Sequence, residues 1–348
     1  MTTARARLIN VEVTRWYHCI SRCVRRAFLL AEDGGNESPF DRKAWIDARL
    51  KELDAIFAIS VGGFSVLDNH FHLLLRVDTL IAKGWSAEEV ACRWFRLCPP
   101  RGKDRLPLPV EKREALLAER TMDATWIETI RDRLTSISWF MKYLKEPLSR
   151  IINRIEKCSG TFFEGRFKSI AILDTESLLA MAAYIDLNPV AAGIALTPEE
   201  SPHTSVMTRV EHVKSLDRIE DLAKSQQVGV QAIKASRMLE EDLWLIPIED
   251  RRGMDSVREG MIQGCTLGNY LALVEYTGRL IRHGKATISS DLEDIFVRLG
   301  SSAQAWQKRM VRMSGSKLIG RFIASTREAL RTAAKLCGVR HLANLSSA

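Results

Sequence analysis

The stretch NHFHLLLRV at residues 69–77 decides the fold prediction for this chain. It is short, rich in branched apolar residues, and it follows a turn signal at residues 68–69, a pattern typical of a β-strand. Side chains alternate between the two faces of a strand, so His70 and His72 share one face and Phe71 lies on the other. Two imidazoles on one face can bind one cation, while Phe71 can anchor the strand in a core.

A second informative stretch is YIDLNPV at residues 184–190. Residues 174–183, which precede it, are strong helix formers with apolar positions recurring about every 3.6 residues. Tyr184 and Asn188 are four residues apart, so they project from one face of this helix, one turn from each other. Because Pro189 disfavours helical geometry at the residue before it, we expect the helix to end at Asn188. The sequence therefore predicts a phenol and an amide side by side at a helix end.

The remaining pattern of residues 1–205 predicts an antiparallel sheet with helices packed on it, an α+β fold. Gly62 and Gly63 indicate a bulge or a close approach within one strand. The expected elements are a first strand at 12–24, a helix at 40–57, a hairpin of strands at 58–67 and 70–77, helices at 86–97, 110–119, 124–145 and 148–157, and an extended segment at 162–173.

Two segments stand apart from this sheet. Residues 79–135 are expected to form a helical insertion, and Pro147 is expected to stop the helix at 124–145. A loop at 197–202 marks a boundary, after which we expect a small all-α domain over residues 206–348 that could bind DNA. Its expected helices lie at 216–224, 266–283, 291–299 and 317–336.

Three blocks of the sequence, taken together, carry a family resemblance. They are the opening strand WYHCISR at 16–22, the His70-Phe71-His72 unit, and GTFFEGRFKSI at 160–170 leading into YIDLNPVAAG at 184–193. In these blocks the chain resembles the single-tyrosine HUH transposases, most closely the REP-associated tyrosine transposase branch. The resemblance covers roughly residues 10–205. It is specific because the three blocks match in their order and in their residues.

The resemblance implies a ferredoxin-like sheet and a DNA strand-transfer activity. Tyr184 would attack a phosphodiester of single-stranded DNA near a hairpin, giving a 5′-phosphotyrosine link. His70, His72 and Asn188 would bind a divalent cation, Mg²⁺ or Mn²⁺, that assists this attack. The chain departs from the family at Ala191, where members often carry an arginine, so one phosphate contact is missing or moved.

The charge of the chain points to the same partner. There are 51 Lys+Arg against 43 Asp+Glu, a formal net charge of +8, and residues 131–170 alone hold nine basic and four acidic residues. Cations bind phosphates, and the interleaved aromatic rings can stack on unpaired bases, an interaction worth ~1–3 kcal/mol per base. The candidate DNA-binding residues are Lys142, Arg150, Arg154, Arg166 and Lys168.

The cysteines and the hydropathy of the chain bear on the cellular compartment of the protein. Seven scattered cysteines, odd in number and without Cys-x-x-Cys spacing, argue against a disulfide framework or a zinc ribbon and favour a reducing cytoplasm. We expect no membrane span, because no apolar run reaches about 18 residues, and no signal peptide at residues 1–7. The sequence leaves a homodimer open.

Other interpretations remain open. Tyr143 lies among many cations and is a rival nucleophile. One alternative function is a metal-dependent hydrolase that adds another histidine, such as His18 or His212, and an acid to the histidine pair. The other is a domesticated DNA-binding protein without cutting activity.

Overall fold

The computed structural model describes residues 9–31, 40–227, 229–250, 259–283, 302–315 and 322–338. The chain divides into two compact units. The first comprises Met1–Ala44, Val61–Leu75 and Thr161–Ala348, and the second comprises Trp45–Ser60 and Arg76–Gly160. The insertion predicted at residues 79–135 lies in the second unit, and the boundary predicted near residue 205 lies within the first.

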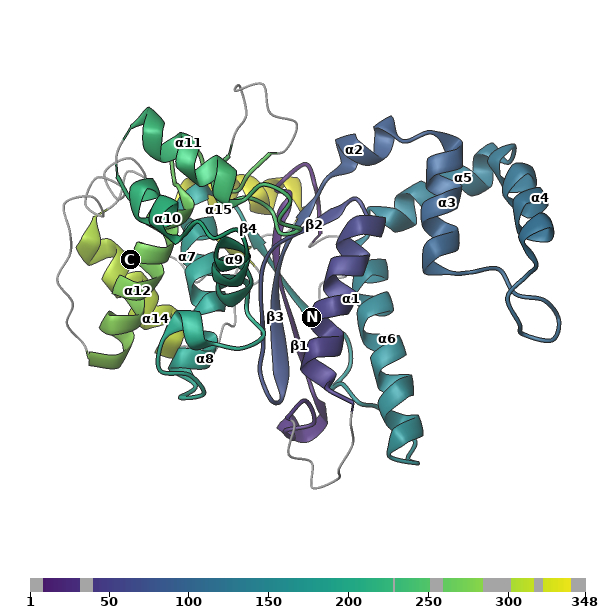
Figure 1. Ribbon diagram of the computed structural model, residues 1–348, viewed down its shortest axis with the longest axis horizontal. Coiled ribbons are helices and arrows are strands. Elements are labelled where there is room, and N and C mark those ends of the chain that lie inside the picture. The colour runs from purple at the N-terminus through teal and green to yellow at the C-terminus, as the bar shows by residue number, and fades with distance from the viewer. Residues whose placement is uncertain are drawn as a thin grey trace. The chain divides into compact units, whose positions relative to one another are not determined.

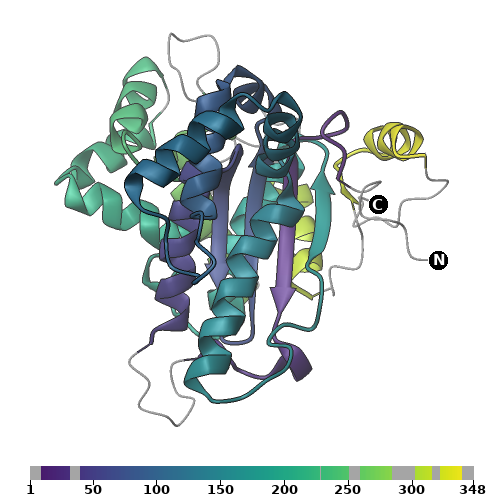
Figure 2. The ribbon, with the colours of Figure 1, turned by 90° about the vertical axis from the view of Figure 1, so that its right-hand side faces the viewer.

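A five-stranded sheet in the order β2-β3-β1-β4-β5 underlies the first unit, so the fold mixes helices and strands as predicted. β1 runs antiparallel to β4, with His18 opposite Ile170 and Ile20 opposite Lys168, and Figure 2 shows the two arrows pointing in opposite directions. β4 pairs in parallel with β5. The strands are β1 (Trp16–Arg22), β2 (Ile59–Val66), β3 (His70–Val77), β4 (Lys168–Ile172) and β5 (Phe322–Ile323).

The predicted hairpin is confirmed, since β2 and β3 are neighbours in the sheet and the Leu67 amide donates to His70 O across the turn, 2.9 Å away. The predicted close approach lies at Gly62. A Cβ at this position would lie 2.8 Å from the Trp16 ring, closer than packed atoms allow. Glycine therefore lets the indole of β1 cover β2.

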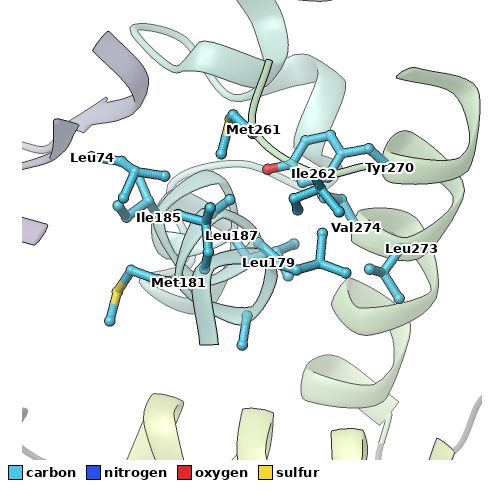
Figure 3. Close-up of a cluster of buried hydrophobic side chains, with 14 of the residues drawn as sticks. Leu74, Leu179, Met181, Ile185, Leu187, Met261, Ile262, Tyr270, Leu273 and Val274 are labelled. Carbon is cyan, nitrogen blue, oxygen red and sulfur yellow. The ribbon is translucent and has the colours of Figure 1, made fainter. Parts of the chain in front are cut away.

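Helices of the first unit pack on the sheet through an extended apolar cluster. Figure 3 shows Leu179 of α7 facing Val274 and Leu273 of α12, while Met181 lies on the other side of α7. Burying such side chains contributes about 1.5–3 kcal/mol each, so this packing holds α7 in place. The helices are α7 (Thr175–Asp186), α8 (Asn188–Ala191), α9 (Ser205–Ser215), α10 (Ile219–Ser225), α11 (Val230–Leu239), α12 (Leu267–His283), α14 (Ala303–Gly315) and α15 (Arg327–Leu336).

Both ends of α7 are well defined, and its C-terminus lies two residues before the end predicted at Asn188. Asp174 caps the N-terminus by accepting a hydrogen bond from the Ser177 amide, 2.8 Å away. The helix ends at Asp186, and Asn188 opens the short helix α8 with Pro189 in its first turn. Tyr184 therefore stands in the last turn of a helix that both α12 and α14 contact, and Figure 1 shows these helices side by side.

The second unit is helical apart from the ends of β2 and β3. A single helix was predicted for residues 124–145, but the segment divides into α5 and α6, and Pro147 lies inside α6 rather than stopping it. Proline leaves the carbonyl four residues earlier without its donor. Arg49 supplies one, because its Nε donates to Tyr143 O at 3.3 Å. The helices are α1 (Arg42–Ile56), most of which belongs to this unit, α2 (Thr79–Gly84), α3 (Ala87–Leu97), α4 (Val110–Thr121), α5 (Ala124–Leu134) and α6 (Ile137–Ile155).

The C-terminal part differs from its all-helical prediction at residues 322–323, which form β5. The reason is the backbone of Leu173 and β4, which pairs with residues 322–323. Of the described residues in the helix predicted at 317–336, Arg327–Leu336 are helical as α15. The helix predicted at 291–299 lies outside the described residues.

Candidate functional site

Three side chains singled out from the sequence come together at the sheet. His70 and His72 of β3 lie 4.9 Å apart between ring centroids, and the ring of Tyr184 from α7 lies 5.7 Å from that of His72. His72 is 2% exposed, whereas His70 and Tyr184 are partly exposed. A strand and a helix that are far apart in the sequence thus place two imidazoles beside one phenol.

A third imidazole belongs to this group. The ring of His18 on β1 lies edge to edge with that of His72, with 15° between the ring planes and its Nε2 2.7 Å from His72 Nδ1. His18 also meets Tyr184 edge-on, with 6.2 Å between ring centroids. His18 is fully buried, and neither its Nδ1 nor His72 Nε2 has a hydrogen-bond partner within the described residues.

Burial keeps these imidazoles neutral. Desolvation lowers the pKa of His18 to about 3 and that of His70 to about 4, and it lowers the pKa of His72 well below its usual value. All three rings are therefore uncharged at neutral pH. Neutral imidazole carries a lone pair on one nitrogen, which is the form that binds a metal ion.

Tyr184 responds to burial in the opposite sense. Desolvation raises the pKa of its phenol, while a side-chain hydrogen bond with Asn188 and the positive charge of Arg22 lower it. The same guanidinium charge lowers the pKa of His70 and His72. Arg22 thus acts electrostatically on all three groups, and it stands at the end of β1 next to them.

Asn188 follows Tyr184 by one helical turn, as predicted. Its side-chain Nδ2 donates to the backbone carbonyl of Tyr184 at 2.9 Å. Because the amide nitrogen makes this bond, the side-chain oxygen is the atom left to accept a hydrogen bond or to approach a cation.

The donor set around the histidine pair suits a cation that keeps open positions. In the described part of the chain, no three or more His, Cys, Asp and Glu side chains are grouped so that they could hold a metal ion by themselves. His72 Nε2 is a buried nitrogen without a hydrogen-bond partner, which fits a ligand position. Two imidazoles and one amide oxygen would leave the remaining positions to phosphate and water.

Two of the five candidate DNA-binding residues lie in the first unit. Lys168 is exposed at the start of β4, and its cross-strand partner Ile20 puts it on the sheet face that carries His18. Arg166 is exposed two residues earlier, before the strand begins. Both cations therefore lie at the beginning of β4, the strand that pairs with β1.

The other three candidates lie in the second unit, exposed on α6. Arg150 pairs with Glu146, so part of its charge is already neutralised. Lys142 lies over the Trp139 ring, 4.7 Å from its centroid. Lys142, Arg150 and Arg154 lie at multiples of four residues along α6, in a row that Glu146 interrupts between Lys142 and Arg150.

The rival nucleophile and two other tyrosines have hydroxyls engaged elsewhere. Tyr143 OH lies 2.6 Å from Cys98 Sγ in the second unit, and burial raises the pKa of this phenol. Tyr17 OH donates to Thr14 O at 2.9 Å, and Tyr270 OH donates to Asp186. Tyr184, in contrast to these three tyrosines, has its ring against His72.

Sequence reasoning did not single out Arg22, and it placed His18 beside the histidine pair only in the hydrolase alternative. The signal was present in part, because alternation along WYHCISR puts His18 and Arg22 on one face of β1. That alternation does not tell which strand lies beside β1. The structure shows that β3 is the neighbour of β1 in the sheet, and this brings His72 to His18.

Comparisons with known proteins give one structural likeness. No protein-family model matches the chain, and no curated protein matches its sequence. A solved structure of a REP-associated tyrosine transposase bound to a REP hairpin matches 56% of this chain and 78% of that chain, with a TM-score of 0.33 and 13% sequence identity. Similarity at this level assigns no function to the present chain.

Membrane insertion finds no support in the helices. Among the helices of the described residues, none combines the length and the apolar character needed to cross a bilayer.

Proposed function

We propose that this protein is a DNA transposase that cuts and rejoins single-stranded DNA through Tyr184. The observation that carries this proposal is the 5.7 Å separation between the Tyr184 and His72 rings, which sets a phenol against a strand-borne pair of neutral histidines. The resemblance of the three sequence blocks to single-tyrosine HUH transposases supports the same function.

The reaction needs one nucleophile and one leaving group. Tyr184 Oη attacks a DNA phosphorus and loses its proton, a new P–O bond forms, and the bond to the 3′ oxygen breaks. That oxygen takes up a proton and leaves as a 3′-hydroxyl, while the 5′ phosphate stays on the tyrosine. Attack by a 3′-hydroxyl on this phosphotyrosine reverses the step and rejoins a strand without a nucleotide cofactor.

His70, His72 and the side-chain oxygen of Asn188 would hold Mg²⁺ or Mn²⁺. When bound, the cation would neutralise charge on the scissile phosphate and favour the phenolate of Tyr184 over the phenol. Arg22 contributes a fixed positive charge at the same place, which offsets part of the cost that burial adds to ionising Tyr184.

The sheet supports the ferredoxin-like arrangement that the family implies. A helix follows β1, the β2–β3 hairpin follows that helix, and further helices precede β4, while the order in space is β2-β3-β1-β4. This order brings β1 and β3 together, and their shared face carries His18, His70 and His72.

The expected substrate is a single strand next to a hairpin. Exposed cations lie at Arg166 and Lys168 in the first unit, and the second unit carries Lys142, Arg150 and Arg154 on α6. Phosphate contacts of this kind give affinity without sequence selectivity, so they suit binding to a backbone beside the cut.

The hydrolase alternative is favoured by one observation, the contact between His18 and His72. It needed Tyr184 to be remote from the pair, and the phenol lies against the rings of His72 and His18. His212 is engaged elsewhere, since its Nε2 lies 2.9 Å from Glu241 O. The covalent mechanism therefore accounts for more of the geometry than hydrolysis does.

The decisive experiment is adduct formation. The full-length protein is incubated with a single-stranded hairpin oligonucleotide and Mn²⁺, and the product is separated under denaturing conditions. We expect a covalent protein–DNA adduct in wild type and in Tyr143→Phe, and none in Tyr184→Phe, which should still bind the hairpin.

Each outcome selects one interpretation. Adduct that persists in Tyr184→Phe and disappears in Tyr143→Phe moves the nucleophile to α6. Cutting without any adduct favours the hydrolase, and hairpin binding without cutting in wild type identifies a non-cutting DNA-binding protein.

A further inference from the structure

The contact between His18 and His72 has a consequence for the cation site, and the inference rests on the proposed function. Two neutral imidazole nitrogens 2.7 Å apart can share only one proton, because two N–H groups would collide and two lone pairs would repel. Which ring holds that proton decides what His72 can do with its other nitrogen.

The tautomer of the neighbouring His70 follows from its partner. Asn69 Nδ2 donates to Arg26 O at 3.2 Å, so the side-chain oxygen of Asn69 is the atom that lies 2.6 Å from His70 Nδ1. An amide oxygen only accepts, so His70 carries its proton on Nδ1 and keeps a lone pair on Nε2. This histidine is thus prepared to bind a cation through Nε2.

His72 has two alternatives. If His18 donated from Nε2, the proton of His72 would sit on its own Nε2, and that buried nitrogen could not bind a metal ion. If His72 donates from Nδ1, its Nε2 keeps a lone pair, and His18 carries its proton on Nδ1. Only the second arrangement gives His72 the same form as His70.

We propose that His18 is a positioning residue that accepts the Nδ1–H of His72 and so presents His72 Nε2 to the cation. Metal-binding histidines usually donate their second ring nitrogen to an acceptor that fixes tautomer and ring orientation. Here the acceptor is another imidazole, held fully buried on β1 with its ring plane within 15° of the ring that it orients.

His18 is suited to this role by its surroundings. Its backbone position is fixed by the pairing of β1 with β4, where it lies opposite the buried Ile170. A charged or mobile acceptor would hold the His72 ring less firmly.

The test is Mn²⁺ affinity without DNA, measured from the free Mn²⁺ signal in electron paramagnetic resonance. His18→Gln keeps an acceptor oxygen near the position of Nε2, whereas His18→Leu has a similar size and no acceptor. We expect His18→Gln to bind within about threefold of wild type and His18→Leu to bind about 10–100-fold more weakly, the usual effect of removing an outer partner of a metal ligand. His72→Ala serves as the control that removes the ligand itself.

The outcomes separate the inference from the proposed function. Equal Mn²⁺ affinity of wild type and His18→Leu, with both folded in EDTA, overturns the inference and leaves the function standing. A wild type that binds no Mn²⁺ overturns both the cation site and the inference.

Should His18→Leu fail to fold, the wild type still gives an answer. Long-range ¹H–¹⁵N correlation spectra of protein with ¹⁵N-labelled histidine report the tautomer of each ring. A proton on Nδ1 of His72 supports the inference, and a proton on Nε2 of His72 overturns it.

Discussion

Ser205 Oγ donates to Asp186 Oδ1 across 2.5 Å and ties the start of α9 to the last residue of α7. The Val206 amide donates to the same oxygen at 3.0 Å, and Tyr270 OH donates to the other. Burial raises the pKa of Asp186, while these donors lower it. The carboxylate lies two residues after Tyr184, so this network fixes the turn that carries the proposed nucleophile.

Tyr270→Phe is therefore expected to weaken the fold. The change removes one donor from a fully buried carboxylate and should lower the free energy of unfolding by about 1–3 kcal/mol. Urea denaturation measures it. Tyr276→Phe is the matched control, because the described residues show no hydrogen bond to that hydroxyl, and equal losses in both variants would contradict the prediction.

A buried ion pair makes a second prediction. Arg209 Nη1 lies 2.7 Å from Glu240 Oε1, both side chains are almost fully buried, and Arg209 also donates to the carbonyls of Gly62 and Ile246. Arg209→Met strands a buried carboxylate and should lower the free energy of unfolding by about 3–5 kcal/mol.

The double variant Arg209→Met/Glu240→Gln tests the reason for that loss. Glu240 also accepts from the Ile248 amide, and glutamine keeps this acceptor without the charge. We expect the double variant to recover part of the lost stability. If it is as unstable as the sum of both single changes, the two side chains are not coupled.

Arg22 gives a prediction about catalysis. Its charge acts on His70, His72 and Tyr184, so Arg22→Ala should slow single-turnover cleavage by about 100-fold, comparable to removing one electrostatic stabiliser of a transition state. Hairpin affinity should change little, because other phosphate contacts supply most of it. Arg22→Lys should retain part of the rate, and a proportional loss of binding and rate would place Arg22 among ordinary DNA contacts.

The buried histidines predict acid sensitivity. A histidine in the unfolded chain titrates near 6.5, whereas folding lowers the pKa of His18 to about 3. Below about pH 6.5 the unfolded chain binds a proton that the folded chain does not, so stability is complete above that pH and falls as the pH drops, by up to about 1.4 kcal/mol per unit for this residue. Denaturant unfolding in EDTA between about pH 7.5 and 5 measures the slope. His18→Gln removes one titrating group and should flatten the slope, and an unchanged slope would contradict this account.

The parts of the fold that sequence could predict are those in which periodicity and local signals agree. The β2–β3 hairpin has alternating apolar residues around a turn, and α7 has an N-cap, strong helix formers and a proline just beyond its end. The same signals placed Tyr184 and Asn188 one turn apart, as the structure has them.

The parts that sequence could not predict depend on distant partners. Pro147 stays inside α6 because Arg49 donates to the carbonyl that proline leaves free. No local sequence pattern around Pro147 predicts this contact with a residue of α1. β5 has only two residues and exists because β4 offers a pairing edge. The contact of His18 with His72 depends on strand order, which alternation within one strand cannot supply.

His18, Arg22, His70, His72, Tyr184 and Asn188 all belong to one compact unit of a single polypeptide. Such a site does not require a second molecule to complete it. The rate of strand cutting per molecule should consequently stay constant on dilution, and the total rate should rise in proportion to enzyme concentration, without a lag. Mixing a Tyr184→Phe chain with a His72→Ala chain should not restore activity.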